Sequence, residues 1–206
     1  MIAISQGACY TSKVIKAVVF DCFGVLVSDA LEAMLEPIRV SDPEKAQHVV
    51  DIVTAANRGM ITREESRAGI SQVLGMSPEA YSQKIRDGEV KNTQLLAYIL
   101  TLRSAYKTAL LSNTSNQGLE LRFAPDELAA HFDVVVASGV IGYAKPAAQA
   151  YEITADQLGA RLDECIMIDD REDYCAGAQG VGMRVIRYES FDQMRVELER
   201  LLQASR

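Results

Sequence analysis

Short runs of consecutive hydrophobic residues recur along the chain, and longer helix-like segments separate them. The runs cover Val14–Phe20, Thr108–Leu111, Val134–Ala137, Cys165–Ile168 and Arg184–Ile186. Apolar runs of this length are typical of strands that are buried on both faces. Because helical segments lie between them, the pattern predicts an α/β fold with a parallel sheet covered by helices on both sides.

The segment between Leu26 and Thr108 departs from this alternation, since it contains helix signals and no convincing strand. Three helix starts are recognisable: a capping box at Thr62 and Glu65, the pair Ser77-Pro78, and the pair Asn92-Thr93. One helix is enough to connect two parallel strands, so the surplus predicts an inserted helical subdomain. We therefore expect a core of residues 1–27 and 92–206 and an inserted cap of residues 28–91.

Two further patterns refine this picture. A single apolar stripe at helical spacing predicts a closing helix, and its members are Phe191, Met194, Leu198 and Leu201. Methionines in the insertion are expected in the interior of the cap rather than on a partner surface, and these are Met34, Met60 and Met76.

Composition narrows the class of protein. The chain has 206 residues, of which 49% are hydrophobic and 24% charged, as in an ordinary globular protein with one substantial domain. The net charge of −7 lacks the basic excess that a nucleic acid or an anionic membrane surface requires. No apolar run is long enough to predict a membrane span. The first twelve residues, Met1 to Ser12, lack the features of a secretory signal.

The four cysteines are Cys9, Cys22, Cys165 and Cys175, and none belongs to a paired CxxC motif. Cys22 and Cys165 adjoin or lie in predicted strands, where a cysteine behaves as a small buried apolar residue. Such unpaired thiols fit a reducing compartment, so we expect a cytoplasmic protein. Cys22 could also act as a nucleophile, but no motif places a histidine to activate it.

Candidate chemistry follows the predicted strands. Asp21 ends the first run, and Gly24 allows the chain to turn directly after it. Open parallel sheets bind their ligands at the carboxyl ends of the strands, although an aspartate there also serves as a helix cap. Asp169 and Asp170 end the fourth run. Adjacent carboxylates repel each other, so they indicate either a cation such as Mg²⁺ or an acidic helix start.

The second and third runs are also followed by polar residues. Ser112, Asn113 and Thr114 can form an anion cradle with free backbone N–H groups, or a simple helix cap. Lys145 lies in a loop before Pro146, where a lysine is usually a solvated charge unless a cleft brings carboxylates to it. Each of these signals is weak when it stands alone.

Together and in this order, the four motifs resemble those of the haloacid dehalogenase (HAD) superfamily of hydrolases. The resemblance runs from about Val14 to Tyr188 and includes smaller matches at His131-Phe132-Asp133 and Gly177-Ala178. It implies a Rossmann-like, three-layer αβα core with a C1-type helical cap inserted just after the first motif.

The resemblance also implies a role for each site residue. Asp21 would attack the substrate and form an aspartyl-enzyme ester. Ser112 and Asn113 would hold phosphate oxygens, and Lys145 would neutralise both the substrate and Asp21. Mg²⁺ would be bound by Asp21, the backbone carbonyl of Phe23 and the acidic pair, of which Asp170 would be a direct ligand and Asp169 a direct or supporting one. The substrate would be a small phosphorylated metabolite.

One position departs from the pattern of the phosphatases. They carry a second aspartate two residues after the nucleophile, which protonates the leaving group, whereas this chain has Phe23. The family's 2-haloacid dehalogenases have an aromatic residue there, but they need no metal and lack an Asp-Asp pair. Three functions therefore remain open: a slow Mg²⁺-dependent phosphatase, a carbon–halogen hydrolase, or a binding protein with little turnover. Substrate identity and oligomeric state are not encoded in any recognisable motif.

Overall fold

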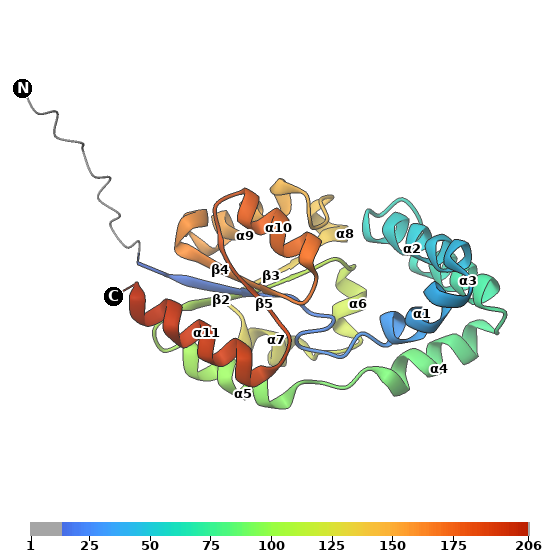
Figure 1. Ribbon diagram of the computed structural model, residues 1–206, viewed down its shortest axis with the longest axis horizontal. Helices are drawn as coiled ribbons and strands as arrows, with labels where there is room; N and C mark the ends of the chain where they lie inside the picture. The colour runs from blue at the N-terminus through green and yellow to red at the C-terminus, as the bar shows by residue number, and fades with distance from the viewer. Residues whose placement is uncertain (1–13, 206) are drawn as a thin grey trace, which may run out of the picture.

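A computed structural model describes residues 14–205 of the chain, so the predictions for Met1 to Ser12, Cys9 included, lie outside the described part. Its centre is a five-stranded sheet in the order β3-β2-β1-β4-β5, with every pair of neighbouring strands parallel (Figure 1). The strands are β1 (Ala17–Phe20), β2 (Lys107–Ser112), β3 (Val134–Ala137), β4 (Cys165–Asp169) and β5 (Arg184–Arg187). The predicted α/β fold is confirmed, and the strand boundaries differ from the predicted ones by at most three residues.

Helices cover both faces of the sheet. One layer contains α5 (Thr93–Leu102), α7 (Pro125–His131) and α11 (Phe191–Ala204), and the other contains α9 (Ala148–Leu158) and α10 (Glu172–Gly180) (Figure 1). Shorter segments complete the core: α6 (Asn116–Glu120), α8 (Ser138–Ile141) and the 3₁₀ turn η1 (Leu162–Glu164). The three-layer, Rossmann-like core is therefore present, and no helix among residues 14–205 is long and apolar enough to cross a membrane.

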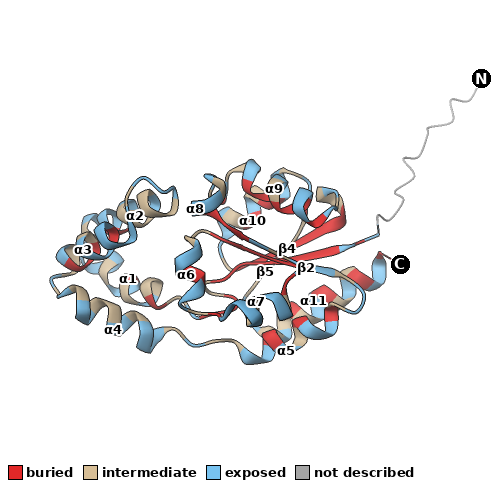
Figure 2. Ribbon diagram, turned by 180° about the vertical axis from the view of Figure 1, so that it is seen from behind, coloured by how far each residue is buried: buried red, intermediate tan, exposed pale blue. Residues whose placement is uncertain are grey.

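The pleat of β1 sends alternate side chains into two separate apolar clusters. Val18 and Phe20 join the cluster beneath α5 and α11, whereas Ala17 and Val19 join the one beneath α9 and α10. Figure 2 shows buried residues concentrated along the strands and on the helix faces turned towards the sheet. Burial on both faces explains why the strands are continuous apolar runs rather than alternating ones.

The stripe on α11 packs as predicted. Met194 and Leu198 are fully buried, and Phe191 and Leu201 are partly buried against the same cluster. All three cysteines in the described part of the chain, including Cys22 and Cys165, are buried and unpaired.

The insertion between β1 and β2 folds into four further helices: α1 (Ala30–Ser41), α2 (Pro43–Asn57), α3 (Arg63–Leu74) and α4 (Pro78–Gly88). They lie together beyond the carboxyl end of β1 (Figure 1) and enclose their own small apolar cluster of Leu35, Val49 and Ile70. The Thr62 capping box is confirmed, with the Thr62 backbone N–H donating to Glu65 Oε2 at 2.7 Å. Met60 is 73% exposed, so its predicted place inside the cap was wrong.

The two connections between the insertion and the core run side by side. The Ser28 backbone N–H donates to the Val90 carbonyl at 3.0 Å, and the Asn92 N–H donates to the Leu26 carbonyl at 2.8 Å. A second contact joins the two parts where Ser138 Oγ on α8 donates to the Asn57 carbonyl at 2.8 Å. The insertion is thus attached to the core next to the loop that follows β1.

Candidate active site

Three carboxylates from two neighbouring strands meet at the carboxyl edge of the sheet. Asp21 directly follows β1, and its backbone N–H donates to the Ile168 carbonyl of β4 at 2.9 Å. Asp169 is the last residue of β4, and Asp170 follows it. One carboxylate oxygen from each of the three lies within 4.8 Å of the others. The parallel pairing of β1 with β4 therefore brings together residues that lie far apart in the sequence.

Lys145 reaches this cluster from the loop after α8. Its side chain is fully buried, and Nζ lies 2.7 Å from Asp21 Oδ1 and 2.5 Å from Asp169 Oδ2. Burial alone would lower the pKa of Lys145, but the two carboxylates raise it above its ordinary value. The lysine is therefore a buried cation shared by two acids and not a solvated loop charge.

Two features hold the Lys145 loop in place. The Asn113 side chain both donates to the Lys145 carbonyl and accepts from its backbone N–H, each at 2.8 Å. On the other side, Gly177 of α10 packs closely on Pro146, where an added Cβ would lie 2.8 Å from the proline carbonyl oxygen. Asn113 thus positions Lys145 in this structure, and its predicted contact with substrate stays a prediction.

The two adjacent aspartates differ in their environment. Asp169 is fully buried, and its second oxygen accepts from the Arg171 backbone N–H at 3.0 Å, so both of its oxygens are occupied. Asp170 Oδ1 is buried and has no hydrogen-bond partner within the part of the chain that the structure describes. Burial, reinforced by the charge of Asp169, raises the pKa of Asp170 to about 6. Burial likewise raises the pKa of Asp21 to about 7, although Lys145 opposes the shift.

This donor set fits a hard divalent cation. Burying clustered carboxylates is costly unless a positive charge compensates them, and Lys145 supplies one charge against three acids. The unpartnered Asp170 oxygen and the neighbouring Asp21 offer oxygen ligands of the kind that Mg²⁺ prefers. Metal binding by Asp21, Asp169, Asp170 and the Phe23 carbonyl nevertheless stays a prediction.

Ser112 ends β2 on the same edge of the sheet. The residue is fully buried, and its hydroxyl oxygen has no hydrogen-bond partner among the described residues. An unsatisfied buried hydroxyl is costly, so a ligand oxygen is a suitable partner for it. The geometry is compatible with the predicted binding of a phosphate oxygen by Ser112.

The environment of Phe23 contains a residue that the sequence did not single out. The guanidinium carbon of Arg122 lies 4.7 Å from the centroid of the Phe23 ring. Arg122 also donates to the Gly118 carbonyl at 2.6 Å and forms an ion pair with Glu89, at the end of α4. No motif surrounds Arg122 in the sequence, so only the fold reveals that it lies beside the position of the missing aspartate.

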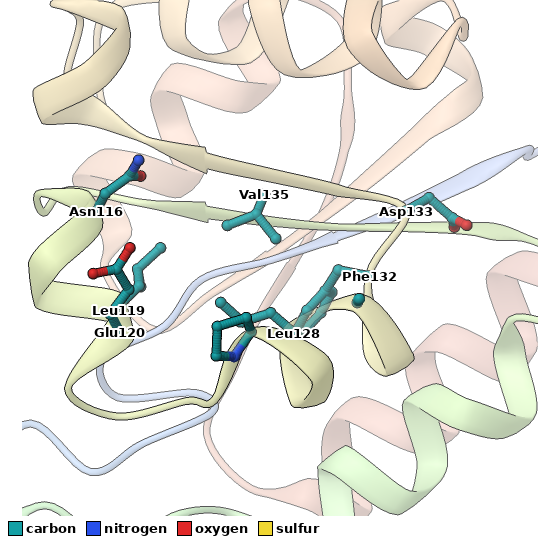
Figure 3. A pocket seen from close by; sticks show the side chains of 9 residues that line it. Asn116, Leu119, Glu120, Leu128, Phe132, Asp133 and Val135 are labelled. Carbon is teal, nitrogen blue, oxygen red and sulfur yellow. The ribbon is translucent and has the colours of Figure 1, made fainter.

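Other candidate residues and cavities are less suited to this chemistry. Burial raises the pKa of the Cys22 thiol, which argues against a thiolate nucleophile. Three arginines of the cap, a residue type that can bind a substrate anion, are exposed as solvated surface charges are: Arg58, Arg63 and Arg67. A groove of about 420 Å³ lies between α6, α7 and β3, lined by residues such as Leu128, Phe132 and Val135 (Figure 3), and none of the clustered carboxylates lines it.

Fold and site together define a hydrolase with an α/β core, a helical cap and a carboxylate–lysine centre. A family model of the haloacid dehalogenase-like hydrolases matches residues 15–182. The chain belongs to this family of hydrolases, as the order of its motifs indicated.

Individual relatives agree with this assignment. The chain is 40% identical over 63 residues to Phosphatase MT3486 of Mycobacterium tuberculosis, a match that covers 31% of this chain but only 29% of that protein. Among solved structures, one described as a predicted HAD-like family hydrolase from Porphyromonas gingivalis is similar, with a TM-score of 0.71 and 26% identity, covering 92% of this chain and 98% of that one. HAD family enzyme BT-2542 of Bacteroides thetaiotaomicron, in complex with magnesium and inorganic phosphate, gives 0.67 and 25%, covering 86% and 96%.

Proposed function

We propose that the protein is a Mg²⁺-dependent phosphate monoester hydrolase that acts on a small phosphorylated metabolite. The observation that carries the proposal is the buried centre in which Lys145 bridges Asp21 and Asp169, while one oxygen of Asp170 has no partner among residues 14–205. A similar structure binds magnesium and inorganic phosphate, and one relative is a phosphatase. We further propose that residues 28–91 act as the cap of a core formed by residues 1–27 and 92–206.

Each residue has a defined task in this proposal. Asp21 attacks the phosphorus atom, and the resulting aspartyl phosphate is then hydrolysed by water. Lys145 holds Asp21 in place and offsets the charge of the incoming anion, while the Ser112 hydroxyl donates to a phosphate oxygen. Mg²⁺ bound by Asp21 and Asp170 would reduce the repulsion between the carboxylate nucleophile and the phosphate dianion.

Turnover is expected to be slow with ordinary alkyl phosphates. Their leaving group is a strongly basic alkoxide, and Phe23 has no proton to give it. General acid–base assistance contributes a factor of about 10²–10⁴ to the rate. The rate should therefore fall short of that of a phosphatase with an aspartate at this position by a factor of this size.

Two other functions stay in consideration because Phe23 is compatible with them. A carbon–halogen hydrolase would also use Asp21 as its nucleophile, since a halide leaves without a proton. A binding protein would use the same centre to hold a phosphorylated ligand without turning it over. The Asp169–Asp170 pair favours metal-dependent chemistry over the metal-free dehalogenase, because one oxygen of Asp170 has no hydrogen-bond partner among the described residues and can bind a cation.

The test is phosphate release from p-nitrophenyl phosphate in Mg²⁺ and in EDTA. We expect release only with Mg²⁺, and its loss in Asp21→Asn. The matched control is Asp126→Asn, which removes an exposed carboxylate in the first turn of α7. Release that persists in EDTA or in Asp21→Asn would contradict the proposal. Chloride release from 2-chloropropionate in EDTA would support the dehalogenase, and a phosphate-induced rise in Tm without turnover would support the binding protein.

A further inference from the structure

Phe23 lies against a fixed cation, at the position where the phosphatases of this family carry their second aspartate. In those phosphatases the second aspartate protonates the leaving group, whereas Phe23 presents an aromatic ring. The group stacked on that ring is the Arg122 guanidinium, at 4.7 Å. A guanidinium is protonated at all physiological pH values, so it can attract a negative charge but cannot act as a general acid.

Arg122 is held in place but is not fully occupied. It forms an ion pair with Glu89 in which the two side chains are 15% and 12% exposed, and it donates to the Gly118 carbonyl. Its Nε atom is buried and has no hydrogen-bond partner among residues 14–205. A buried donor without a partner is costly, so a further hydrogen-bond acceptor at Arg122 would be favourable.

We propose that this site selects phosphoryl donors whose leaving group departs as a weakly basic oxyanion, an acyl or aryl phosphate, with Arg122 as the cation that faces the departing charge. This inference rests on the proposed phosphatase function and specifies its substrate class. The physical reason is that a carboxylate or a phenolate is stable without a proton, whereas an alkoxide is not.

The chemistry balances without a general acid. A carboxylate oxygen of Asp21 forms a bond to phosphorus while the bond from phosphorus to the leaving oxygen breaks, and the electron pair of that bond departs with the oxygen. Water then attacks the aspartyl phosphate, the electron pair of the broken bond returns to Asp21, and the proton of the water passes to solvent. The products are the leaving anion, inorganic phosphate and one proton.

Asp29 is a nearby carboxylate that provides the competing explanation, since it interacts electrostatically with both Asp170 and Arg122. Asp29 caps α1, and its Oδ1 accepts from the Glu32 backbone N–H at 2.9 Å. If Asp29 protonated the leaving group, the site would not need a weakly basic one. The two explanations differ in how the rate depends on the leaving group, so the experiment measures that dependence.

The experiment compares kcat/KM for acetyl phosphate, a series of aryl phosphates with phenols of increasing basicity, and an alkyl phosphate, all with Mg²⁺. We expect the wild-type rate to fall steadily as the leaving group becomes more basic, with acetyl phosphate hydrolysed at least about 10²-fold faster than the alkyl phosphate. A rate independent of leaving-group basicity would overturn the inference while leaving the proposed function intact. Absence of turnover with every substrate would overturn both.

Variants then test Phe23 and the competing proton donor Asp29. Phe23→Asp should raise the rate with the alkyl phosphate more than with acetyl phosphate. Because Arg122 would hold the new carboxylate ionised, Phe23→Asp is also measured together with Arg122→Gln. If neither Phe23→Asp nor the double variant made the rate less dependent on leaving-group basicity, the proposed role of position 23 would be contradicted. Selective loss of alkyl phosphate hydrolysis in Asp29→Asn would identify Asp29 as the proton donor and overturn the inference.

The role of Arg122 has its own matched control. Arg122→Gln removes the cation, whereas Glu89→Gln removes its ion-pair partner and leaves the cation in place. We expect acetyl phosphate hydrolysis to fall in Arg122→Gln and to be retained in Glu89→Gln. Equal losses in the two variants would show that the ion pair matters only as a link between the cap and the core.

Discussion

Gly24 and Asp170 make one of the closest approaches in the site, and this contact can be tested directly. Gly24 has φ = +85°, and a Cβ added there would lie 2.3 Å from Asp170 Oδ2. Gly24→Ala should therefore destabilise the protein and displace the Asp170 carboxylate. Gly75→Ala is the matched control, because Gly75 has φ = +72° but open space around it. Its cost should be only the backbone strain, about 1–2 kcal/mol.

The two glycine variants are compared by urea unfolding in EDTA and by Mg²⁺ titration followed calorimetrically. Gly24→Ala should lose more stability than Gly75→Ala and should bind Mg²⁺ more weakly, whereas Gly75→Ala should bind it like the wild type. Equal behaviour of the two variants in both measurements would argue against Asp170 as a metal ligand.

The sequence predicted the identities of the clustered residues better than their contacts. Asp21, Asp169 and Asp170 could be recognised because they lie where two apolar runs end, and strand ends of a parallel sheet share one edge. Lys145 could not be placed in the same way, since a loop lysine is normally solvated. Its burial depends on Asn113 and on the close packing of Gly177 against Pro146, which are tertiary contacts that no local pattern encodes.

At the scale of the elements, Asp133 joins the end of α7 to the starts of two strands. Its Oδ2 accepts from the Thr108 backbone N–H, and its Oδ1 accepts from Arg103, both at 2.8 Å. Burial would raise the pKa of Asp133, but these hydrogen bonds hold it below its ordinary value of 3.8. The ionised form is therefore favoured in the folded protein.

This shift predicts a pH-dependent loss of stability in Asp133→Asn. A carboxyl group whose pKa is lower in the folded than in the unfolded protein stabilises the fold at pH values above the unfolded pKa, near 3.8. This contribution is lost as pH falls through the folded pKa. The variant should therefore be less stable than the wild type at pH 7 and approach it towards pH 3. Urea unfolding across this range measures the difference, and a difference that is constant with pH would contradict the assignment.

The strands and most capped helices were predictable because their signals are local. Apolar runs identified all five strands, and side-chain caps identified the starts of α3, α4 and α5. The order β3-β2-β1-β4-β5 was not predictable, since it depends on which runs pair across the fold. The starts of α1 and α2 were missed, although Asp29 and Asp42 cap them with their side chains.

At the scale of the whole molecule, the cap and the core have separate apolar interiors. The buried cluster of the cap consists of Leu35, Val49 and Ile70, and it shares no member with the two clusters that line the sheet. The links between the two parts are largely polar. They include the paired connections at Ser28 and Val90, the contact from Ser138 to Asn57, and the ion pairs of Arg122 with Glu89 and of Lys91 with Glu127. We therefore expect the cap to open without unfolding the sheet.

Leu35→Ala tests this independence. Removing a buried leucine side chain costs about 2–5 kcal/mol, and here the cost should fall on the cap alone. Hydrogen exchange should accelerate in α1–α4 and stay slow in β1, β2 and β4, and Mg²⁺ should still raise the Tm of the core, because Asp21, Asp169 and Asp170 all lie outside the cap. Leu110→Ala, at a fully buried position of β2, is the control that should accelerate exchange in the sheet. If Leu35→Ala instead accelerated exchange in the strands to the same extent as in the cap, the two parts would unfold as one unit, and the proposed division at residues 28–91 would be wrong.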